Sequence, residues 1–413
     1  MSTLLLTTAP PARAQAAPGW AEAARANVDA EPPWAAPRAQ GLAHMARGND
    51  AAAWPLLQKA AAMANEALGP QHPQVWALRN ALGTAFTRAG RFSEAEDTFS
   101  TLLVQQRQAG ASEAAVGATL SHLGALHTRQ GRYREAEARH LEALQRLQQA
   151  LGAEHLDLTR AHNNLGALYR QMGRLPQAEV HLQRSLLLRE RALGEGHVDV
   201  GTARVNLGNL YRDMGVLDRA EALLRGALAV LEDRLGPKHP MVATARNNLA
   251  LVLVDAGDHE RARPLLEGSL AARREALGPA HPDVAKSLGN LARTRAALGD
   301  ETGVLPLLQQ ALEIQLQHFT APHRDVAQTL REIADLKVRR GDVAEARALY
   351  ERSARMLEAA FEEGHPELAV ALTRLADLAA GSADLFAYGI SDVLTALMVS
   401  GNYGAATAIG TAA

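Results

Sequence analysis

The sequence predicts an all-α fold, a solenoid of stacked helical hairpins, and three observations lead to this prediction. Histidine and glycine recur along the chain at an almost constant interval. The apolar residues are mostly Ala and Leu, which favour helix, whereas aromatic residues make up only 4% of the chain. Within each interval, apolar residues recur in steps of three and four, the spacing of one face of a helix. Such a chain is best explained as one structural unit repeated in tandem.

The repeat is defined by two series of landmark residues. Successive members of the histidine series lie 42 residues apart: His155, His197, His239, His281, His323 and His365. The earlier His72 lies 83 residues before the first of these, which equals one interval of 41 and one of 42. The glycine series contains the same slip, with intervals of 42, 41 and then 42 throughout: Gly48, Gly90, Gly131, Gly173, Gly215, Gly257, Gly299 and Gly341. Two series with one shared slip indicate a single period of 42 residues.

Each period contains two helical segments. Residues 158–172 carry apolar residues on one face and stop at Gly173, a residue type that commonly ends helices. Residues 175–193 form a second and longer segment. A small residue recurs in every first segment at the position of Gly166, and Ala recurs in most second segments at the position of Ala178. Because two helices approach closely only where side chains are small, each unit is predicted to be a helical hairpin.

The connection between units is also patterned. The sequence Leu-Gly-Pro-x-His-Pro occurs at residues 68–73, 235–240 and 277–282. The glycine would end one helix and the second proline would begin the next, where its missing N–H does no harm. The recurring histidine is therefore expected to have a structural role at a helix junction. One histidine per repeat lies too far from its neighbours to share a metal ion with bonds of about 2.0–2.1 Å, so no metal site is expected.

Composition argues against several classes of function. The 413-residue chain has a formal net charge of −2 with both signs interspersed, which argues against nucleic-acid partners. It contains no cysteine, so disulfides, cysteine metal sites and cysteine nucleophiles are excluded. No run of 18 apolar residues exists, and no membrane span is predicted. The motifs HExxH, GxSxG and GxGxxG and the P-loop motif are missing, so neither an enzyme nor a bound cofactor is expected.

The most regular stretches are residues 163–169 (NNLGALY), 247–250 (NNLA), 274–278 (REALG) and 281–286 (HPDVAK). They resemble the tetratricopeptide repeat, in the 42-residue form of kinesin light chains and many bacterial repeat proteins. The resemblance covers about residues 41–379. It implies a right-handed superhelix of stacked hairpins whose first helices line a concave face. The matching positions of the family contact peptides, although the fold alone does not fix the biology.

Polar side chains of the first helices that lie outside the hairpin core and the stacking seam form the predicted peptide-binding groove: Arg160, Asn163, Asn164, Arg170, Asn206, Asn209, Arg212, Asn247, Asn248, Lys286, Asn290 and Arg293. Asparagine is unfavourable inside a helix, so its recurrence in four successive repeats calls for an explanation. A side-chain amide can donate to and accept from a peptide backbone, and nearby arginine and lysine would select acidic groups. Two alternatives stay open: the amides bridge neighbouring helices, and the arginines are simply solvated.

Three segments are predicted along the chain. Residues 1–40 form an Ala/Pro-rich leader, expected to be disordered or to be the remnant of an export signal, since an Ala-Gln-Ala sequence follows a short apolar run. The chain as written is expected in the cytoplasm, whereas an export signal would place it in the periplasm or outside. Residues 41–380 form about eight repeats. Residues 381–413 form an apolar capping helix with a Gly/Ala-rich tail that could self-associate, or else part of a further domain.

The predicted function is that of an adaptor or scaffold that binds an extended peptide or partner protein in the concave groove. The expected partner is a protein or peptide, with acidic groups among the features that the groove selects. Two alternatives remain. The chain would be a structural or oligomerising scaffold that uses its ends, or the recognition half of a larger signalling protein whose effector domain lies beyond this sequence.

Overall fold

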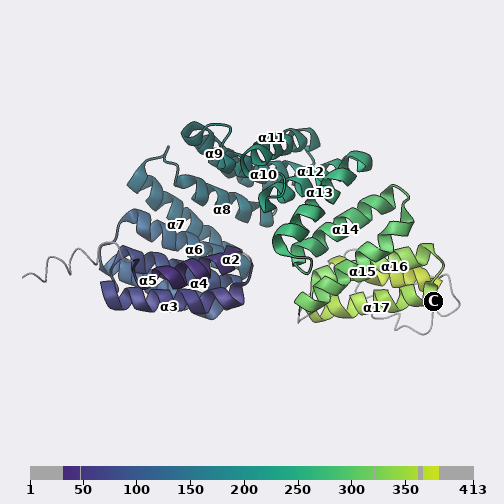
Figure 1. Cartoon of the computed structure of the whole chain (residues 1–413), viewed down its shortest axis with the longest axis horizontal. Helices are drawn as coiled ribbons and strands as arrows, with labels where there is room; N and C mark the ends of the chain where they lie inside the picture. The colour runs from purple at the N-terminus through teal and green to yellow at the C-terminus, as the bar shows by residue number, and fades with distance from the viewer. Residues whose placement is uncertain (1–30, 47, 320–321, 361–365, 381–413) are drawn as a thin grey trace, which may run out of the picture. The chain divides into compact units, whose positions relative to one another are not determined.

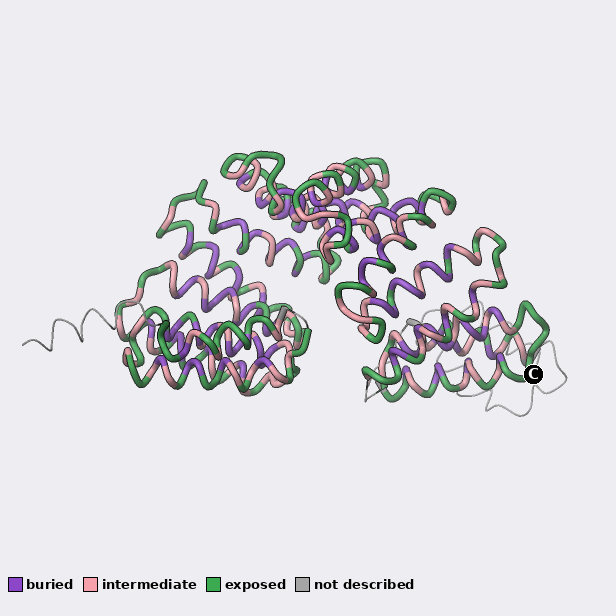
Figure 2. Tube along the Cα trace, viewed as in Figure 1, coloured by how far each residue is buried: buried purple, intermediate pink, exposed green. Residues whose placement is uncertain are grey.

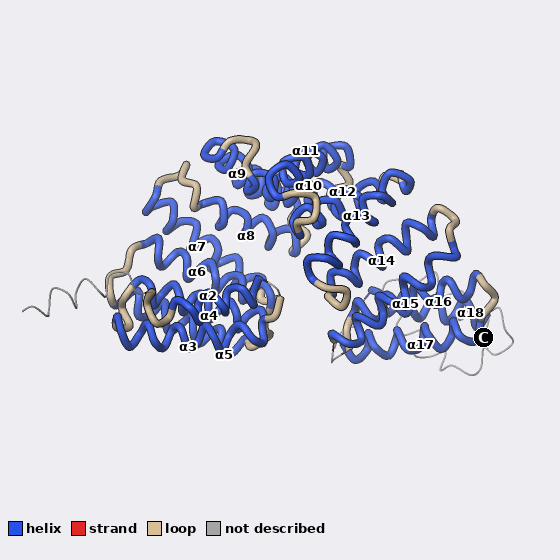
Figure 3. The backbone as a smooth tube through the Cα atoms, in the orientation of Figure 1, coloured by secondary structure: helices blue, strands red, loops and turns tan. Residues whose placement is uncertain are grey.

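The structure is a computed structural model that describes residues 31–46, 48–319, 322–360 and 366–380 (Figure 1). Helices make up nearly all of it, and no strand occurs within these residues (Figure 3). The first helices of the hairpins are α2 (Ala35–Ala46), α4 (Pro73–Arg88), α6 (Glu113–Arg129), α8 (Leu158–Gln171), α10 (Val198–Asp213), α12 (Pro240–Asp255), α14 (Pro282–Ala297) and α16 (Arg324–Arg339). The second helices are α3 (Asp50–Leu68), α5 (Phe92–Gln108), α7 (Tyr133–Leu151), α9 (Leu175–Leu193), α11 (Leu217–Leu235), α13 (His259–Leu277), α15 (Glu301–His318) and α17 (Val343–Ala360). One more helix, α18 (Pro366–Ala380), follows the last hairpin, so the predicted all-α fold of stacked hairpins is confirmed.

The chain divides into two compact units, residues 1–150 and 151–413. The described part of the first unit holds the hairpins from α2 to α7, and that of the second holds the hairpins from α8 to α17 together with α18. Within each unit, buried residues follow the faces that helices turn to their neighbours, and exposed residues gather at the turns (Figure 2). This is the burial pattern of stacked repeats, in which neighbours complete each other's core.

The close approach predicted within each hairpin is present. Gly166 on α8 lies against Leu182 on α9, and a Cβ added to the glycine would lie 2.5 Å from Leu182 Cγ. Gly208 and Leu224 form the same contact in the next hairpin, where the corresponding distance is 2.8 Å. Leu165, beside the first glycine, is fully buried. Packing therefore requires glycine here, because a larger side chain would overlap the branched carbon of the partner leucine.

The turns and junctions follow the two landmark series. Gly173 ends α8 with a φ of 70°, a left-handed conformation that glycine adopts at little cost. At the other end of the hairpin, the recurring histidine is the N-cap residue of the next first helix, except at α8, whose N-cap is Asp157. Its Nδ1 atom accepts a hydrogen bond of 3.1–3.2 Å from the backbone N–H two residues later, at His72, His155, His197, His239, His281 and His323. The predicted junction role is confirmed at these positions, while His365 lies outside the described residues.

The repeats begin earlier than the sequence pattern indicates. Helix α2 starts at Ala35, six residues before the predicted boundary at residue 41. Trp34, which is only 9% exposed, packs with Ala60 on α3 and Val75 on α4 and anchors the start of this helix. The prediction of an irregular leader through residue 40 is therefore wrong for residues 35–40. The Ala/Pro-rich composition concealed a helix that packs on α3 through Gly41, which lies against Leu57, and through Met45.

The remaining end segments lie outside the described residues. They include residues 1–30, with the predicted disordered leader or export signal, and residues 381–413, with the predicted capping helix and the self-association expected from it. The last described helix, α18, packs on α17 through Leu375, which joins Tyr350 in a buried cluster. None of the described helices combines the length and apolar character needed to span a bilayer.

Candidate functional site

The predicted groove residues all lie on first helices of the second unit. Helix α8 carries Arg160, Asn163, Asn164 and Arg170; α10 carries Asn206, Asn209 and Arg212; α12 carries Asn247 and Asn248; α14 carries Lys286, Asn290 and Arg293. Each is exposed or partly exposed except Asn247, which is 7% exposed. Helix geometry repeated at the 42-residue period brings equivalent positions to the same face of successive first helices.

Side-chain amides form cross-helix bridges at alternate boundaries between first helices. Asn206 on α10 donates a 2.7 Å hydrogen bond from Nδ2 to Oδ1 of Asn163 on α8. Asn290 on α14 donates one of 2.9 Å to Asn247 on α12. In both bridges the acceptor lies 43 residues before the donor, which is one residue more than the 42-residue period. These four amides thus have the bridging role that the sequence left open as an alternative.

The intervening boundaries lack the acceptor residue of the bridge. Val205 stands one repeat after Asn163 at the same position, and Gly289 stands one repeat after Asn247 at the same position. Asn248 lies 43 residues after Val205, at the donor position of the missing bridge. It instead accepts a weak 3.5 Å hydrogen bond from its neighbour Asn247. The interruption follows directly from the sequence, because neither valine nor glycine has a polar side chain.

Several of the basic side chains predicted to select acidic groups hold carboxylates of the chain itself. Arg170 pairs with Asp213 one helix away, and Arg212 Nε lies 2.5 Å from Asp255 Oδ2 in the equivalent contact of the next repeat. The side chains of these pairs are 31–43% exposed, so each pair is worth about 1 kcal/mol or less. Their charge is balanced within the chain, which weakens the expected preference for acidic partners.

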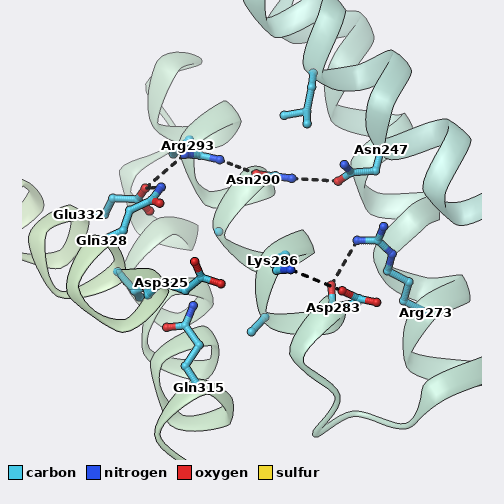
Figure 4. A pocket seen from close by; sticks show the side chains of 14 residues that line it. Asn247, Arg273, Asp283, Lys286, Asn290, Arg293, Gln315, Asp325, Gln328 and Glu332 are labelled. Atoms are coloured by element: carbon cyan, nitrogen blue, oxygen red, sulfur yellow. Dashed lines mark hydrogen bonds and ion pairs between the residues drawn. The ribbon is translucent and has the colours of Figure 1, made fainter. Parts of the chain in front are cut away.

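Four of the predicted residues line one cavity of about 410 Å³ between α12, α14 and α16 (Figure 4). They are Asn247, Lys286, Asn290 and Arg293. The other polar residues of the lining were not among the predicted groove residues: Arg273 on α13, Asp283 on α14, Gln315 on α15 and Asp325, Gln328, Thr329 and Glu332 on α16. The period itself could have found three of them, since adding 42 to residues 283, 286 and 290 gives 325, 328 and 332.

One wall of the cavity is braced by a buried arginine. Arg273 is 8% exposed, and its Nη1 donates to the backbone oxygen of Asp283 at 3.2 Å and to Ser287 Oγ at 2.7 Å. Burial lowers the pKa of the Arg273 guanidinium below its ordinary value. With these acceptors in place, the side chain fixes α13 against α14 and gives the cavity a rigid edge.

The opposite wall carries a shielded carboxylate. The Glu332 side chain is 16% exposed and accepts a 2.9 Å hydrogen bond from Gln328, while Arg293 Nη1 lies 3.4 Å from it. Burial raises the pKa of the Glu332 carboxyl above its ordinary value, against the opposite effect of Arg293. Figure 4 shows a continuous line of contacts from Glu332 through Arg293 and Asn290 to Asn247. The cavity is thus a preformed polar site built on three successive first helices.

The first unit has a cavity of its own, of about 460 Å³, which contains none of the predicted residues. Arg79 lines it and donates to Asn65 at 3.1 Å and to Gln105. Burial lowers the pKa of this guanidinium. The equivalent Arg204 instead pairs with Glu190, at 2.8 Å, so the two arginines differ in the charge of their partner.

Comparison with known protein families decides the identity of the repeat. The family model described as tetratricopeptide repeat matches residues 35–103, 115–191, 157–233, 199–273, 241–317 and 325–385. The chain belongs to the tetratricopeptide repeat family. The resemblance inferred from the asparagine, glycine and histidine patterns is confirmed, and the tetratricopeptide repeats extend to residue 35, where α2 begins. No curated protein sequence matches the chain significantly.

Solved structures of other tetratricopeptide repeat proteins have a similar fold. A Rap protein complexed with competence and sporulation factor is 12% identical, with a TM-score of 0.53, over 85% of this chain and 99% of that one. The apo form of RapI is 13% identical, with a TM-score of 0.53, over 68% of this chain and 98% of that one. BtubC (BKLC) from P. vanneervenii is 25% identical, with a TM-score of 0.46, over 55% of this chain and 90% of that one. The Rap likenesses support the tetratricopeptide repeat fold.

Proposed function

We propose that the chain is a scaffold that binds an extended segment of a partner protein along the first helices of its second unit. The tetratricopeptide repeat is generally a non-catalytic module for protein interaction. In the Rap protein named above, the same fold is found complexed with competence and sporulation factor. For this chain we therefore propose recognition of a protein or peptide, with no catalysis by the repeats.

The cavity between α12, α14 and α16 is the observation that carries the proposal. It is lined by side-chain amides, cations and carboxylates from three consecutive repeats, and four of its residues were predicted from sequence to face a ligand. An extended peptide advances about 3.3 Å per residue, so a few residues suffice to cross adjacent first helices, which pack about 8–10 Å apart. The mixture of donors and acceptors suits a peptide backbone, which offers both.

The proposal is tested by peptide display against the full-length chain. We expect an enriched peptide to bind with a Kd of about micromolar strength, equivalent to about −8 kcal/mol. Fluorescence anisotropy should then show clear weakening for an Asn248→Ala, Lys286→Ala double variant, because both residues belong to the predicted groove and neither takes part in the amide bridges between first helices.

A matched control is Lys238→Ala. Lys238 lies at a junction, is 74% exposed and lies 2.8 Å from Glu275, away from the residues that line the cavity. We expect this variant to bind the peptide as the parent chain does. A screen without enrichment, or equal binding by the double variant, would reject the groove and direct attention to the ends of the chain.

A further inference from the structure

The row of polar side chains along the first helices is interrupted in the cavity at one position, which glycine occupies. Asn247 accepts the amide hydrogen bond of Asn290, but the residue equivalent to Asn247 in the next repeat is Gly289. A Cβ placed on Gly289 would have no neighbour within 4 Å. Empty space thus extends down to the helix backbone at this point. We name the part of the cavity at Gly289 the Gly289 hollow; Gln315, Asp325 and Glu332 line the same cavity.

Hydrogen-bond acceptors surround the hollow. Glu332 stands in the register position of Asn290, so its carboxylate comes to the place where Gly289 supplies no partner side chain. Gln315 is 5% exposed, and no hydrogen-bond donor among the described residues reaches its Oε1 atom. Figure 4 shows the amide end of Gln315 directed toward the carboxylate of Asp325. A buried acceptor without a donor is costly, which points to a donor supplied from outside.

The cations of the cavity lie at its edges and already have acceptors. Arg273 is bound to Asp283 and Ser287, and Arg293 is bound to Asn290 and Glu332. Lys286 is 58% exposed and lies 3.9 Å from Asp283, at the mouth of the cavity. The capacity left unused is therefore that of the acceptors, and a ligand with several donors satisfies it best.

We propose that the Gly289 hollow binds the guanidinium group of an arginine in the partner segment, with Glu332, Asp325 and Gln315 as its acceptors. The proposal rests on the groove function described above. A guanidinium offers five N–H donors in a plane and matches carboxylates two at a time. It would also offset the cost of burying Glu332, whose pKa burial raises above its ordinary value. An acidic side chain would meet two carboxylates there.

A chemical probe tests the hollow without any peptide. The chain has no cysteine, so Gly289→Cys places a single thiol in the hollow, and the open space around Gly289 accommodates it. The full-length variant is labelled with cationic aminoethyl methanethiosulfonate and with anionic sulfonatoethyl methanethiosulfonate, and both rates are followed by mass spectrometry. The control is Ala167→Cys, an exposed position on α8, which corrects for the intrinsic reactivity of the reagents.

We expect the ratio of cationic to anionic labelling rates to be about tenfold higher at Gly289→Cys than at Ala167→Cys, because the carboxylates concentrate cations locally. Adding Glu332→Gln to Gly289→Cys should bring the ratio back toward the control. A ratio equal to or below that of Ala167→Cys would overturn the proposal. Circular dichroism of each variant verifies that the helices are intact.

The second arm uses the peptides from the display screen. Each arginine is replaced by citrulline, a neutral side chain of the same shape. We expect one such replacement to weaken binding to the parent chain by about tenfold and to have little effect on the Glu332→Gln variant, since the guanidinium–carboxylate contact is then already lost. Peptides that bind equally well with every arginine replaced would overturn the hollow while leaving the groove function in place. If the screen yields no peptide, the groove function fails, and the labelling ratio still decides the hollow.

Discussion

The Nδ1 atoms of His162 on α8 and His181 on α9 lie 3.0 Å apart, within one hairpin of the second unit. The His181 ring also stacks on Tyr169, with 5.5 Å between ring centroids. Burial, together with the charge of the neighbouring imidazole, lowers the pKa of His162 to about 4, and burial lowers the pKa of His181. The hydrogen bond requires one nitrogen with a proton and one without, so at least one of the two rings is neutral, and the lowered pKa values favour the neutral form of both near pH 7. Protonation of these buried histidines should therefore destabilise this hairpin.

We predict that the free energy of unfolding falls as the pH is lowered from about 6.5 toward 4. His162 and His140 each have a folded pKa of about 4, lowered by burial from the ordinary 6.5. Between these values the unfolded chain binds protons that the folded chain does not, so the stability present above about pH 6.5 is lost on acidification. Each group contributes at most about 3 kcal/mol. Urea unfolding at a series of pH values measures the loss, and a flat profile would contradict it.

The chain supplies its own control for the first unit. His140 on α7 packs against Gly124 in the position that Leu182 and Leu224 occupy in later hairpins. His140→Leu should therefore fit, raise the stability near neutral pH by about 1 kcal/mol through apolar burial, and reduce the acid sensitivity of this unit. Unchanged acid sensitivity in this variant would show that another group titrates. Unfolding followed by circular dichroism at about pH 7.5 and about pH 5 separates the two results.

Substitution of Gly166 should destabilise the second unit. A Cβ at this position would lie 2.5 Å from Leu182 Cγ, so Gly166→Ala forces the two helices apart, at a cost of about 1–3 kcal/mol. Gly289→Ala is the matched control, because it places the same methyl group on a first helix where nothing lies within 4 Å. There we expect a gain of about 0.5–1 kcal/mol, the usual advantage of alanine in a helix. Equal effects of the two substitutions on the unfolding midpoint would refute the packing argument.

The amide bridge between Asn247 and Asn290 should contribute a measurable coupling energy. A double-mutant cycle with Asn247→Ala and Asn290→Ala is expected to give about 0.5–1.5 kcal/mol, because the two side chains share a 2.9 Å hydrogen bond. The equivalent cycle with Val205→Ala and Asn248→Ala lacks a polar pair. Its coupling should be smaller than about 0.5 kcal/mol. Similar values for both cycles would mean that the amide bridge adds nothing to ordinary packing.

Loss of a histidine cap should loosen one repeat junction. His239 Nδ1 accepts the backbone N–H of Met241 at 3.2 Å, so His239→Ala leaves this donor without its partner at the start of α12. We expect a loss of about 0.5–2 kcal/mol, and recovery of much of it in His239→Asn, whose side chain also caps helices. Hydrogen exchange at the start of α12 localises the effect. Equal protection in His239→Ala and the parent chain would exclude the capping role.

Features that repeat could be predicted from the sequence. Several repeats contain the same hairpin, the same small residue at the position of Gly166 and the same junction histidine. Each of these predictions therefore rested on several equivalent positions in the sequence. The start of α2 was missed because it depends on Trp34, a single contact without a counterpart in other repeats. The candidate groove could be assigned to first helices from periodicity alone. Whether an arginine there is solvated or paired depends on neighbours in other repeats, as Arg212 and Asp255 demonstrate.

The Gly289 hollow was beyond sequence reasoning for a physical reason. It is produced by an absent side chain, and a pattern search registers the residues that are present. Its acceptor Gln315 comes from α15, a second helix, and its contribution depends on how closely neighbouring hairpins pack. A comparison of each groove residue with its equivalent one repeat later would nevertheless have drawn attention to Glu332 at the position of Asn290.

The alternation of bridges has a consequence for how the second unit responds to salt. The amide bridge between α12 and α14 involves no charge. Ion pairs join the other first helices: Arg170 with Asp213 between α8 and α10, Arg212 with Asp255 between α10 and α12, and Arg293 with Glu332 between α14 and α16. Salt screens exposed ion pairs and leaves neutral hydrogen bonds largely unaffected. We expect rising ionic strength to loosen these three joints and to spare the joint between α12 and α14, so that the stiffness of the second unit becomes uneven along its length at high salt.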